Sequence, residues 1–283
     1  YKRQLPGYLP ANGLVLWMPF SGNANDLSGN NNNGTVNGAT LSNDRFNGAN
    51  NAYTFNGNGN YILVNNCTNM DNNYLTASLW FKTSSSQFQQ LIYKVNFGNS
   101  QKEEYSLCTN FNQSGIINAS VKNGNNCNNP GSGWMMNNIS ASYLDGNWHH
   151  LVFTYNGSNS RVYFDGAQIS NTVFPTSVID NCSGGKFIIG VNYAGNIGFN
   201  GQIDDIGIWN RALTQQEITA LYQGCSGSVT SSITPTGNTS FCAGSNVLLN
   251  ATQGAGYSYQ WLLNGMPING ATNASYTASQ PGN

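Results

Sequence analysis

Two short stretches carry the carboxylates whose spacing could do chemistry. Asp204 and Asp205 stand side by side within the apolar phrase IDDIGIW, in a chain of 283 residues of which only 7% are charged. Asp26 lies in SGNANDLSGNNNNGT, a stretch rich in side-chain oxygens. Carboxylate and amide oxygens are the ligands that hard cations such as Ca²⁺ prefer. Two carboxylates that flank one sugar–sugar bond can instead catalyse its hydrolysis.

The loop around Asp26 supports two interpretations. Asn23, Asn25, Ser28 and Asn30 surround the carboxylate in the sequence and offer further oxygen ligands to a cation. The alternative is a cluster of Asn and Gly turns that contains an Asp by chance, because these residues adopt turn conformations readily. The loop alone leaves both interpretations open.

The carboxylates are poorly spaced for a glycoside hydrolase. The chain has three glutamates, which are Glu103, Glu104 and Glu217. Neighbouring residues of a strand point to opposite faces, so two adjacent acids cannot flank one glycosidic bond. This argument applies to Glu103 with Glu104 and equally to Asp204 with Asp205.

The other candidate groups have structural explanations. His149 and His150 lie within a predicted strand, and neither has an obvious Ser or Cys partner for nucleophilic catalysis. Thr214 and Glu217 form a capping-box pattern, in which each side chain bonds the other residue's backbone N–H. We therefore predict that the chain is not an enzyme.

Short strands must position these groups. The stretch 199–222, FNGQIDDIGIWNRALTQQEITALY, predicts a strand that becomes a short helix. The strand at 75–82 alternates as if one face were buried, and residues 21–35 are predicted to form a loop. Further strands are predicted at 13–20, 52–64 (two strands around an Asn-Gly turn), 91–95, 105–109, 116–122, 148–155, 161–164 and 186–190. The pattern predicts an all-β jelly-roll sandwich.

Composition narrows the class of partner. The net charge is −1, so no basic face is available for nucleic acid or anionic lipid. No run approaches the roughly 20 apolar residues of a membrane helix, and we predict no direct membrane insertion. Few charges with many amides and aromatic residues suit a surface that faces sugars, although an ordinary secreted β-protein has the same composition.

Six dispersed cysteines predict disulfides and an oxidising, extracellular compartment. Cys108 and Cys127 flank a predicted hairpin region, and closing a loop of roughly 20 residues would contribute about 3 kcal/mol. A Cys67–Cys182 pair follows mostly by elimination. Cys242 is expected to be free or paired with Cys225.

Changes in composition and in hydrophobic pattern divide the chain into four parts. Residues 1–12 are predicted to be an extended lead-in, 13–224 the jelly roll, and 225–239 a linker rich in Ser, Thr, Gly and Pro. Residues 240–283 hold too few predicted strands for an immunoglobulin-type sandwich, which needs about seven. We expect this part not to close by itself, and Trp261 to lack the cover of an opposite sheet.

Several phrases carry a specific family resemblance. NGLVLWMPFSGNANDLSGNNNNGT, DRFNGANNAYTFNGNGNYI, LDGNWHHLVFTYNG, RVYFDG, FNGQIDDIGIWNRAL and EITALY follow one another between residues 12 and 222. Together they resemble the laminin-G-like, concanavalin A-like domains of bacterial surface proteins. Residues 240–283 resemble a truncated Ig-like repeat of the kind that follows such domains in secreted Bacteroidota proteins, often cargo of type IX secretion.

The resemblance implies a metal site, and it also shows one stretch where this chain differs from the family pattern. In many members one structural Ca²⁺ lies between the loop of the first phrase and the acids of the IDD phrase. By that resemblance Asp26, with Asn23 and Ser28 in the loop and Asp204 or Asp205 opposite, would be the ligands. The family pattern F-D-G-x-x-D-Y-I appears here as FNGNGNYI, so Asn56 and Asn60 replace both acids.

The family implies a module rather than a reaction. Two hypotheses remain for a secreted or cell-surface protein of this kind. One is an adhesion module that binds a glycan or another cell-surface ligand. The other is a spacer or fibre subunit, in which copies of the chain assemble by strand donation.

Overall fold

The computed structural model describes residues 5–65, 67–70, 72–96, 102–122, 134–175, 179, 185–224, 233–236, 245–252 and 259–280. The chain divides into two compact units. The larger consists mainly of Pro10–Tyr222, and the smaller mainly of Gln223–Asn283. Each unit is described by itself.

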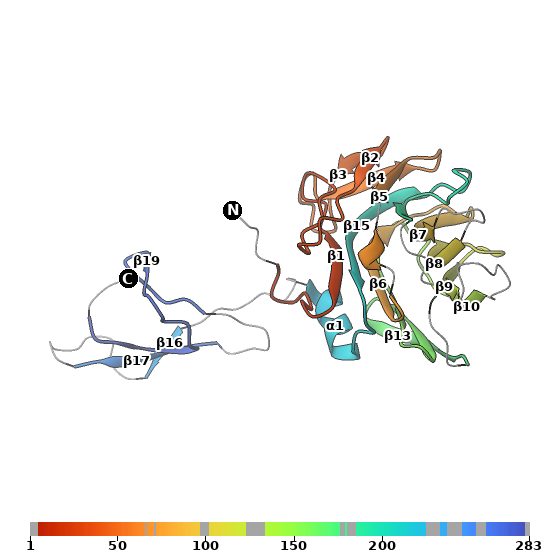
Figure 1. Ribbon diagram of the computed structural model, residues 1–283. Coiled ribbons are helices and arrows are strands. Elements are labelled where there is room, and N and C mark those ends of the chain that lie inside the picture. The colour runs from red at the N-terminus through yellow and green to blue at the C-terminus, as the bar shows by residue number, and fades with distance from the viewer. Residues whose placement is uncertain are drawn as a thin grey trace. The chain divides into compact units, whose positions relative to one another are not determined.

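The larger unit is a sandwich of two antiparallel sheets (Figure 1). Along sheet A the order is β13 (Ala167–Val173), β12 (Asn159–Phe164), β11 (Trp148–Tyr155), β6 (Leu75–Lys82), β15 (Asn200–Trp209), β4 (Ala52–Asn56) and β3 (Thr40–Ser42), with β1 (Leu14–Met18) also paired to β15. Along sheet B it is β10 (Trp134–Ser140), β9 (Ile116–Lys122), β8 (Lys102–Thr109), β7 (Gln89–Asn96), β14 (Lys186–Ile189), β5 (Tyr61–Asn65) and β2 (Thr35–Asn37). The all-β sandwich prediction is confirmed.

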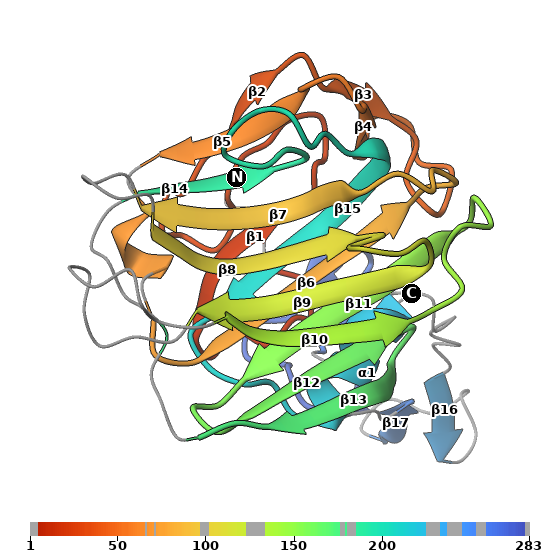
Figure 2. The ribbon, with the colours of Figure 1, turned by 90° about the vertical axis from the view of Figure 1, so that its right-hand side faces the viewer.

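The core lies between the sheets. Figure 2 shows sheet B in front of sheet A, with the strands of both layers spanning the unit. Alternate residues of each strand point inward, such as Leu79 and Phe81 of β6 and Phe187 and Ile189 of β14. A 3₁₀ turn, η1 (Thr68–Met70), adds Met70 to the same core.

Strand β6 differs from the prediction of one buried face. Its outward residues Thr76, Ser78 and Trp80 are buried as well. The reason is that helix α1 (Gln215–Gln223) lies against this side of sheet A (Figure 1), where the ring of Tyr222 stacks on Trp80 with centroids 5.6 Å apart. Sequence alternation could not reveal this cover, because it comes from a distant element.

The strand-to-helix prediction for residues 199–222 is confirmed. Thr214 caps α1: its Oγ1 accepts from Glu217 N at 3.3 Å, and Glu217 Oε2 accepts from Thr214 N at 2.8 Å. Within β15 the pairing with β6 shifts between Asp204 and Gly207, and Asp205 has a φ of 47°. This bulge turns two consecutive acids toward the same neighbourhood.

Among the strands that the structure describes in the larger unit, sequence reasoning missed four, and each lies at the edge of a sheet. They are β2, β3, β10 and β13. An edge strand has a neighbour on one side only and needs fewer apolar residues, as the mostly exposed residues of β13 illustrate. The predicted hairpin of 148–155 with 161–164 is confirmed by the β11–β12 ladder.

The smaller unit has a strand where the sequence predicts a linker. A strand, β16 (Ile233–Thr236), lies within the expected linker and pairs with β17 (Val247–Ala251), which also pairs with β20 (Ser275–Ala278). Pro235 is compatible with β16 because this strand is an edge. A two-stranded ladder, β18 (Leu262–Leu263) with β19 (Met266–Pro267), completes the described elements.

Trp261 is buried rather than uncovered. Its side chain stacks on Tyr276 with ring centroids 5.6 Å apart, and its Nε1 donates to the carbonyl of Asn273 at 2.9 Å. Only 8% of the residue is exposed. The expectation that it lacks cover was wrong, because Tyr276 of strand β20 in the same unit covers it.

Candidate functional site

Asp26 ties its loop to strand β1. Its Oδ1 accepts hydrogen bonds from Trp17 N at 3.0 Å and Ser28 N at 2.8 Å. Its Oδ2 accepts from the backbone N–H of Asn32 at 2.9 Å and lies 2.8 Å from the Ser28 hydroxyl. Asn23 instead accepts from Asn25 N at 2.9 Å, within a local turn. The polar side chains of this loop therefore organise its turns.

Asp204 and Asp205 share a guanidinium. The loop between β3 and β4 brings Arg45 Nη1 to 3.1 Å from Asp204 Oδ2 and to 2.7 Å from Asp205 Oδ2. The Arg45 side chain is 8% exposed, and its guanidinium carbon lies 4.4 Å from the ring centre of Trp80. Burial first, and the Asp205 charge second, raise the pKa of Asp204 to about 9. The Arg45 guanidinium offsets negative charge on this buried pair of acids.

These residues do not fit a calcium ion shared between the two stretches. Each oxygen of Asp26 faces N–H or O–H donors, which occupy the lone pairs that a cation would use. Oδ2 of Asp204 and Oδ2 of Asp205 both contact Arg45, whose positive charge would repel a second cation at close range. Oδ1 of Asp204 accepts a hydrogen bond from Asp205 N at 2.7 Å. The carboxylate charge is thus offset by backbone dipoles at one stretch and by a guanidinium at the other.

Calcium is therefore expected to leave stability unchanged. We predict that the Tm of the protein measured by calorimetry is the same in about 1 mM CaCl₂ and in excess EDTA. The reason is that the contacts described above leave no set of oxygen ligands arranged around a calcium ion at these residues. A rise in Tm with CaCl₂ that disappears in Asp26→Asn would contradict this prediction and restore the shared site.

The remaining candidate acids are also engaged. Glu104 forms a buried ion pair with Lys94, with Nζ 3.0 Å from Oε1. Glu217 belongs to the helix cap, where it also pairs with Arg211. The side chain of Glu103 lies outside the described part of the structure. None of the engaged acids faces a second carboxylate across a cleft in the part that the structure describes.

The two histidines are held as structural groups. His150 Nε2 lies 2.9 Å from Ser78 Oγ and its ring stacks on Trp80, and burial lowers the pKa of His150 to about 3. His149 bridges two acids, with Nδ1 2.8 Å from Asp165 and Nε2 3.0 Å from Asp145. Its pKa is raised, chiefly by the hydrogen bond to Asp165.

The cysteine predictions remain predictions. Cys67 and Cys108 are buried, and Cys108 Sγ lies 3.8 Å from Asn118 Oδ1. Their predicted partners Cys127 and Cys182 lie outside the described residues. The same holds for Cys225 and Cys242.

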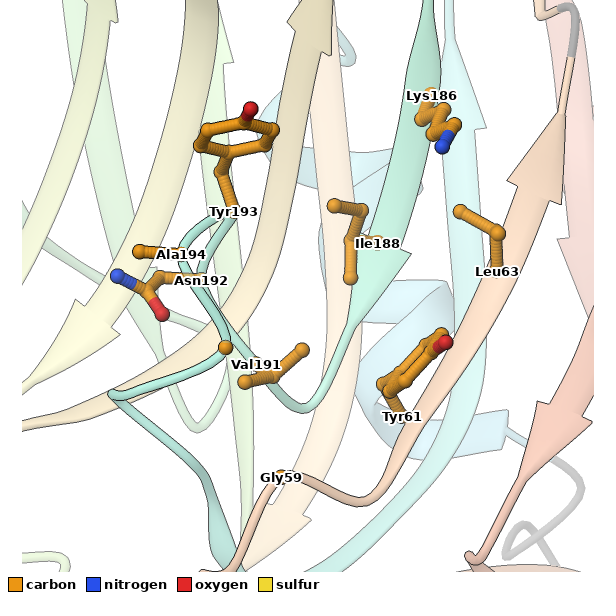
Figure 3. Close-up of a pocket in the computed structure, with 10 residues that line it drawn as sticks. Gly59, Tyr61, Leu63, Lys186, Ile188, Val191, Asn192, Tyr193 and Ala194 are labelled. Atoms are coloured by element: carbon orange, nitrogen blue, oxygen red, sulfur yellow. The ribbon is translucent and has the colours of Figure 1, made fainter.

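A pocket of about 420 Å³ opens on the outer face of sheet B (Figure 3). On β5 and β14 the residues that alternate with the core residues point outward and form its floor and walls. The lining comprises Gly59, Tyr61, Leu63, Lys186, Ile188, Val191, Asn192, Tyr193, Ala194 and Gly195. In Figure 3 the rings of Tyr61 and Tyr193 lie on opposite sides of Ile188.

The pocket wall is held by two interlocked loops. Gly57 of the β4–β5 turn donates from its N–H to the carbonyl of Phe199 at 2.8 Å. A Cβ at Gly198 would lie 2.4 Å from the Gly57 oxygen, so the two backbones approach too closely for a side chain. Asn192 Oδ1 accepts from the N–H groups of Asn196 at 3.1 Å and Ile197 at 3.0 Å. These contacts preform the pocket.

Sequence reasoning did not find this pocket. The sequence predicts one strand that contains Tyr61 and Leu63 and another that contains Ile188, but nothing in either stretch indicates that the two strands are neighbours. The available signal was the aromatic and apolar character of outward positions, which on an exposed sheet face marks a binding surface.

A match to a known family decides the classification. Residues 56–219, more than half of the chain, match the Concanavalin A-like lectin/glucanases superfamily (Laminin_G_3). The chain belongs to this family. The laminin-G-like resemblance of the jelly roll is thereby confirmed, while the Ig-like character of the last residues stays a prediction.

A mouse protein shares a short segment with this laminin-G-like chain. Pappalysin-1 of Mus musculus is 33% identical over 84 residues, which is 28% of this chain and 5% of the relative.

Solved structures share the fold at low sequence identity. The binding domain of Paraclostridial Mosquitocidal Protein 1 matches with a TM-score of 0.58 and 20% identity, over 78% of this chain and 53% of that one. Domain 4 of AbnA, an extracellular GH43 arabinanase from Geobacillus stearothermophilus, was solved with arabinotriose. It matches with a TM-score of 0.55 and 19% identity, over 74% of this chain and 98% of that one. A third structure is of botulinum neurotoxin type C, whose cell entry is described as dependent on two ganglioside molecules. It matches with a TM-score of 0.54 and 16% identity, over 75% of this chain and 51% of that one. The chain thus spans about half the length of the two toxin structures.

Proposed function

We propose that the larger unit is a non-catalytic glycan-binding module and that its site is the pocket on sheet B. The observation that carries the proposal is the pairing of two tyrosine rings, Tyr61 and Tyr193, with an aliphatic floor and a few polar groups. A pyranose ring presents apolar C–H faces and a rim of hydroxyls. Aromatic rings bury such faces, and sparse polar groups orient the ligand.

The lining also argues for binding without cleavage. Hydrolysis of a glycoside needs two carboxylates set about 5–9.5 Å apart across the bond. No Asp or Glu is among the lining residues that the structure describes. We therefore expect no release of reducing ends from any polysaccharide that binds.

The similar structures support the proposal by analogy. One is described as a binding domain, one was solved with arabinotriose, and one is tied to gangliosides. The arabinanase is described as extracellular. Together with the even number of dispersed cysteines, this supports a secreted or cell-surface location. Among the helices that the structure describes, none is long and apolar enough to cross a membrane.

The smaller unit supports a second, compatible role in self-assembly. Within its described residues the apolar side chains of Leu248, Leu262 and Met266 are 39%, 51% and 72% exposed. Its sheet has β16 and β20 as edges. Open edges beside apolar side chains favour pairing with another strand, which is the spacer or fibre hypothesis. Sedimentation of the full chain at increasing concentration would test it, and a monomer throughout would reject it.

A glycan array tests the binding function directly. We expect the fluorescently labelled full chain to bind a restricted group of glycans, and a soluble form of the same glycan to compete. Binding to no glycan, or uniform binding that a soluble glycan fails to compete, would reject the proposal.

A further inference from the structure

We propose that His149 is a pH-sensitive latch, which while charged holds the tip of the loop between β10 of sheet B and β11 of sheet A (Figure 2). The tip consists of residues 145–147. The observation that carries the proposal is one imidazole placed between two carboxylates from two different segments. Nδ1 of His149 lies 2.8 Å from Asp165 Oδ2 in the β12–β13 turn, and Nε2 lies 3.0 Å from Asp145 Oδ1 in the tip.

Both contacts are hydrogen bonds only when the imidazole carries two protons. A neutral imidazole has one N–H and one lone pair, whereas an ionised carboxylate only accepts. One of the two carboxylates would then face a lone pair at hydrogen-bonding distance. The imidazolium donates to both, so the geometry itself favours the charged form. The hydrogen bond to Asp165 is the largest cause of the raised pKa of His149; burial opposes it, and the bond to Asp145 adds to it.

The other groups packed around the ring are aromatic. The ring stacks on Phe164 of β12 with centroids 4.9 Å apart, and it lies 6.3 Å from the ring of Phe81 of β6. Phe81 points into the core, so the next residue of that strand, Lys82, points to the opposite face. Arg161 of β12 pairs with Thr154, five residues farther along β11. Neither cation faces the imidazole, and the two acids set its charge.

Loss of one proton would release Asp145 rather than Asp165. Asp165 is also fixed through the backbone: its Oδ1 accepts from His150 N at 2.8 Å, and its N–H donates to the carbonyl of His150 at 2.9 Å. The other bonds of Asp145 stay within the tip, where it accepts from N and Nδ2 of Asn147, both at 2.9 Å. Its side chain is 48% exposed, so water is at hand to hydrate the released carboxylate.

The anchors on either side of the tip confine the movement. Tyr143 is fully buried and donates from its hydroxyl to Asn110 Oδ1 at 2.8 Å. Burial raises the pKa of Tyr143 to about 12, so this anchor keeps its proton near neutral pH. Leu144 packs against the core. Among the hydrogen bonds that the structure describes for residues 145–147, the bond to His149 is the one that leaves the tip.

The direction of the shift fixes the pH window. A histidine whose pKa is raised on folding stabilises the fold fully below its ordinary value of 6.5, and this contribution is lost as pH rises through the raised value. His150 is the other histidine of the chain, and its pKa of about 3 keeps it neutral in this window. The pKa of Asp204 is raised to about 9, so variants of His149 are needed to separate the two titrations.

Nuclear magnetic resonance of the full chain tests the latch. We expect spectra of the imidazole nitrogens to show both His149 nitrogens protonated at about pH 6.5, with a midpoint above that pH. Across the same midpoint the backbone order parameters of Gly146 and Asn147 should fall from about 0.85 toward 0.6. A His149 midpoint at or below its ordinary value, or equal order parameters on both sides of the midpoint, would overturn the inference.

Three variants separate the latch from a purely structural role. Asp145→Asn should lower the His149 midpoint and leave the tip equally mobile at every pH, because the second carboxylate is gone. Asp44→Asn is the matched control: Asp44 also caps a loop, accepting from the N–H groups of Phe46 and Gly48, and its loss should leave the His149 midpoint unchanged. Thermal melts verify that each variant folds. A pH-dependent tip that persists in Asp145→Asn or in folded His149→Gln would also overturn the proposal.

Discussion

Replacing Arg45 with Met is expected to destabilise the larger unit by about 3–5 kcal/mol, the usual result of removing one partner from a buried ion pair. The guanidinium contacts Asp204 and Asp205 at 3.1 and 2.7 Å, and both carboxylates are largely buried. Methionine fills similar space, so the loss would come from uncompensated charge and from the contact with Trp80. Urea unfolding followed by tryptophan fluorescence and circular dichroism measures the change.

A matched variant and a double mutant sharpen this prediction. Arg161→Met alters an arginine of β12 outside the cluster and should cost no more than about 0.5 kcal/mol. Asp205→Asn should recover part of the stability of Arg45→Met, because it removes the charge left unpaired. Strictly additive effects of the two substitutions would show that the ion pair is not what the arginine contributes.

Tyr61→Ala is expected to weaken binding of an array-identified glycan by about 2 kcal/mol, or roughly 30-fold in Kd. The ring forms one wall of the pocket, and its removal would leave the sugar face in contact with water. Isothermal titration of the folded variant gives the value, and Tyr193→Ala should have a comparable effect from the facing wall.

The control for the pocket is a tyrosine elsewhere. Tyr74 is 48% exposed and does not line the pocket, so Tyr74→Ala should bind like the wild type. If Tyr74→Ala and Tyr61→Ala weakened binding equally, the pocket would not be the site.

Local patterns in the sequence predicted the elements whose signals are local. The phrase at 199–222 contains both the apolar strand and the Thr214–Glu217 cap, and both form as expected. Edge strands such as β13 were not predicted, because they bury few side chains and therefore show only a weak alternation of apolar and polar residues. The burial of the outward face of β6 was not predicted, because Tyr222, which covers Trp80 there, belongs to a helix that is distant in the sequence.

The site depended on contacts that the sequence could not show. Arg45 and Asp204 lie 159 positions apart, and no spacing rule links them. The bulge that turns Asp205 toward the same arginine is a backbone feature, with a φ of 47° at a residue that usually avoids it. The pocket likewise joins β5 to β14 across more than a hundred residues.

The most direct test of the central claim is a methyl chemical-shift titration of the full chain with a glycan that the array identifies. Leu63, Ile188 and Val191 line the pocket, whereas Ile169 of β13 and Leu248 of β17 lie elsewhere. The account predicts saturable shifts for the first three methyl groups and none for the other two. Saturable shifts at Ile169 or Leu248, with Leu63, Ile188 and Val191 unchanged, would contradict it.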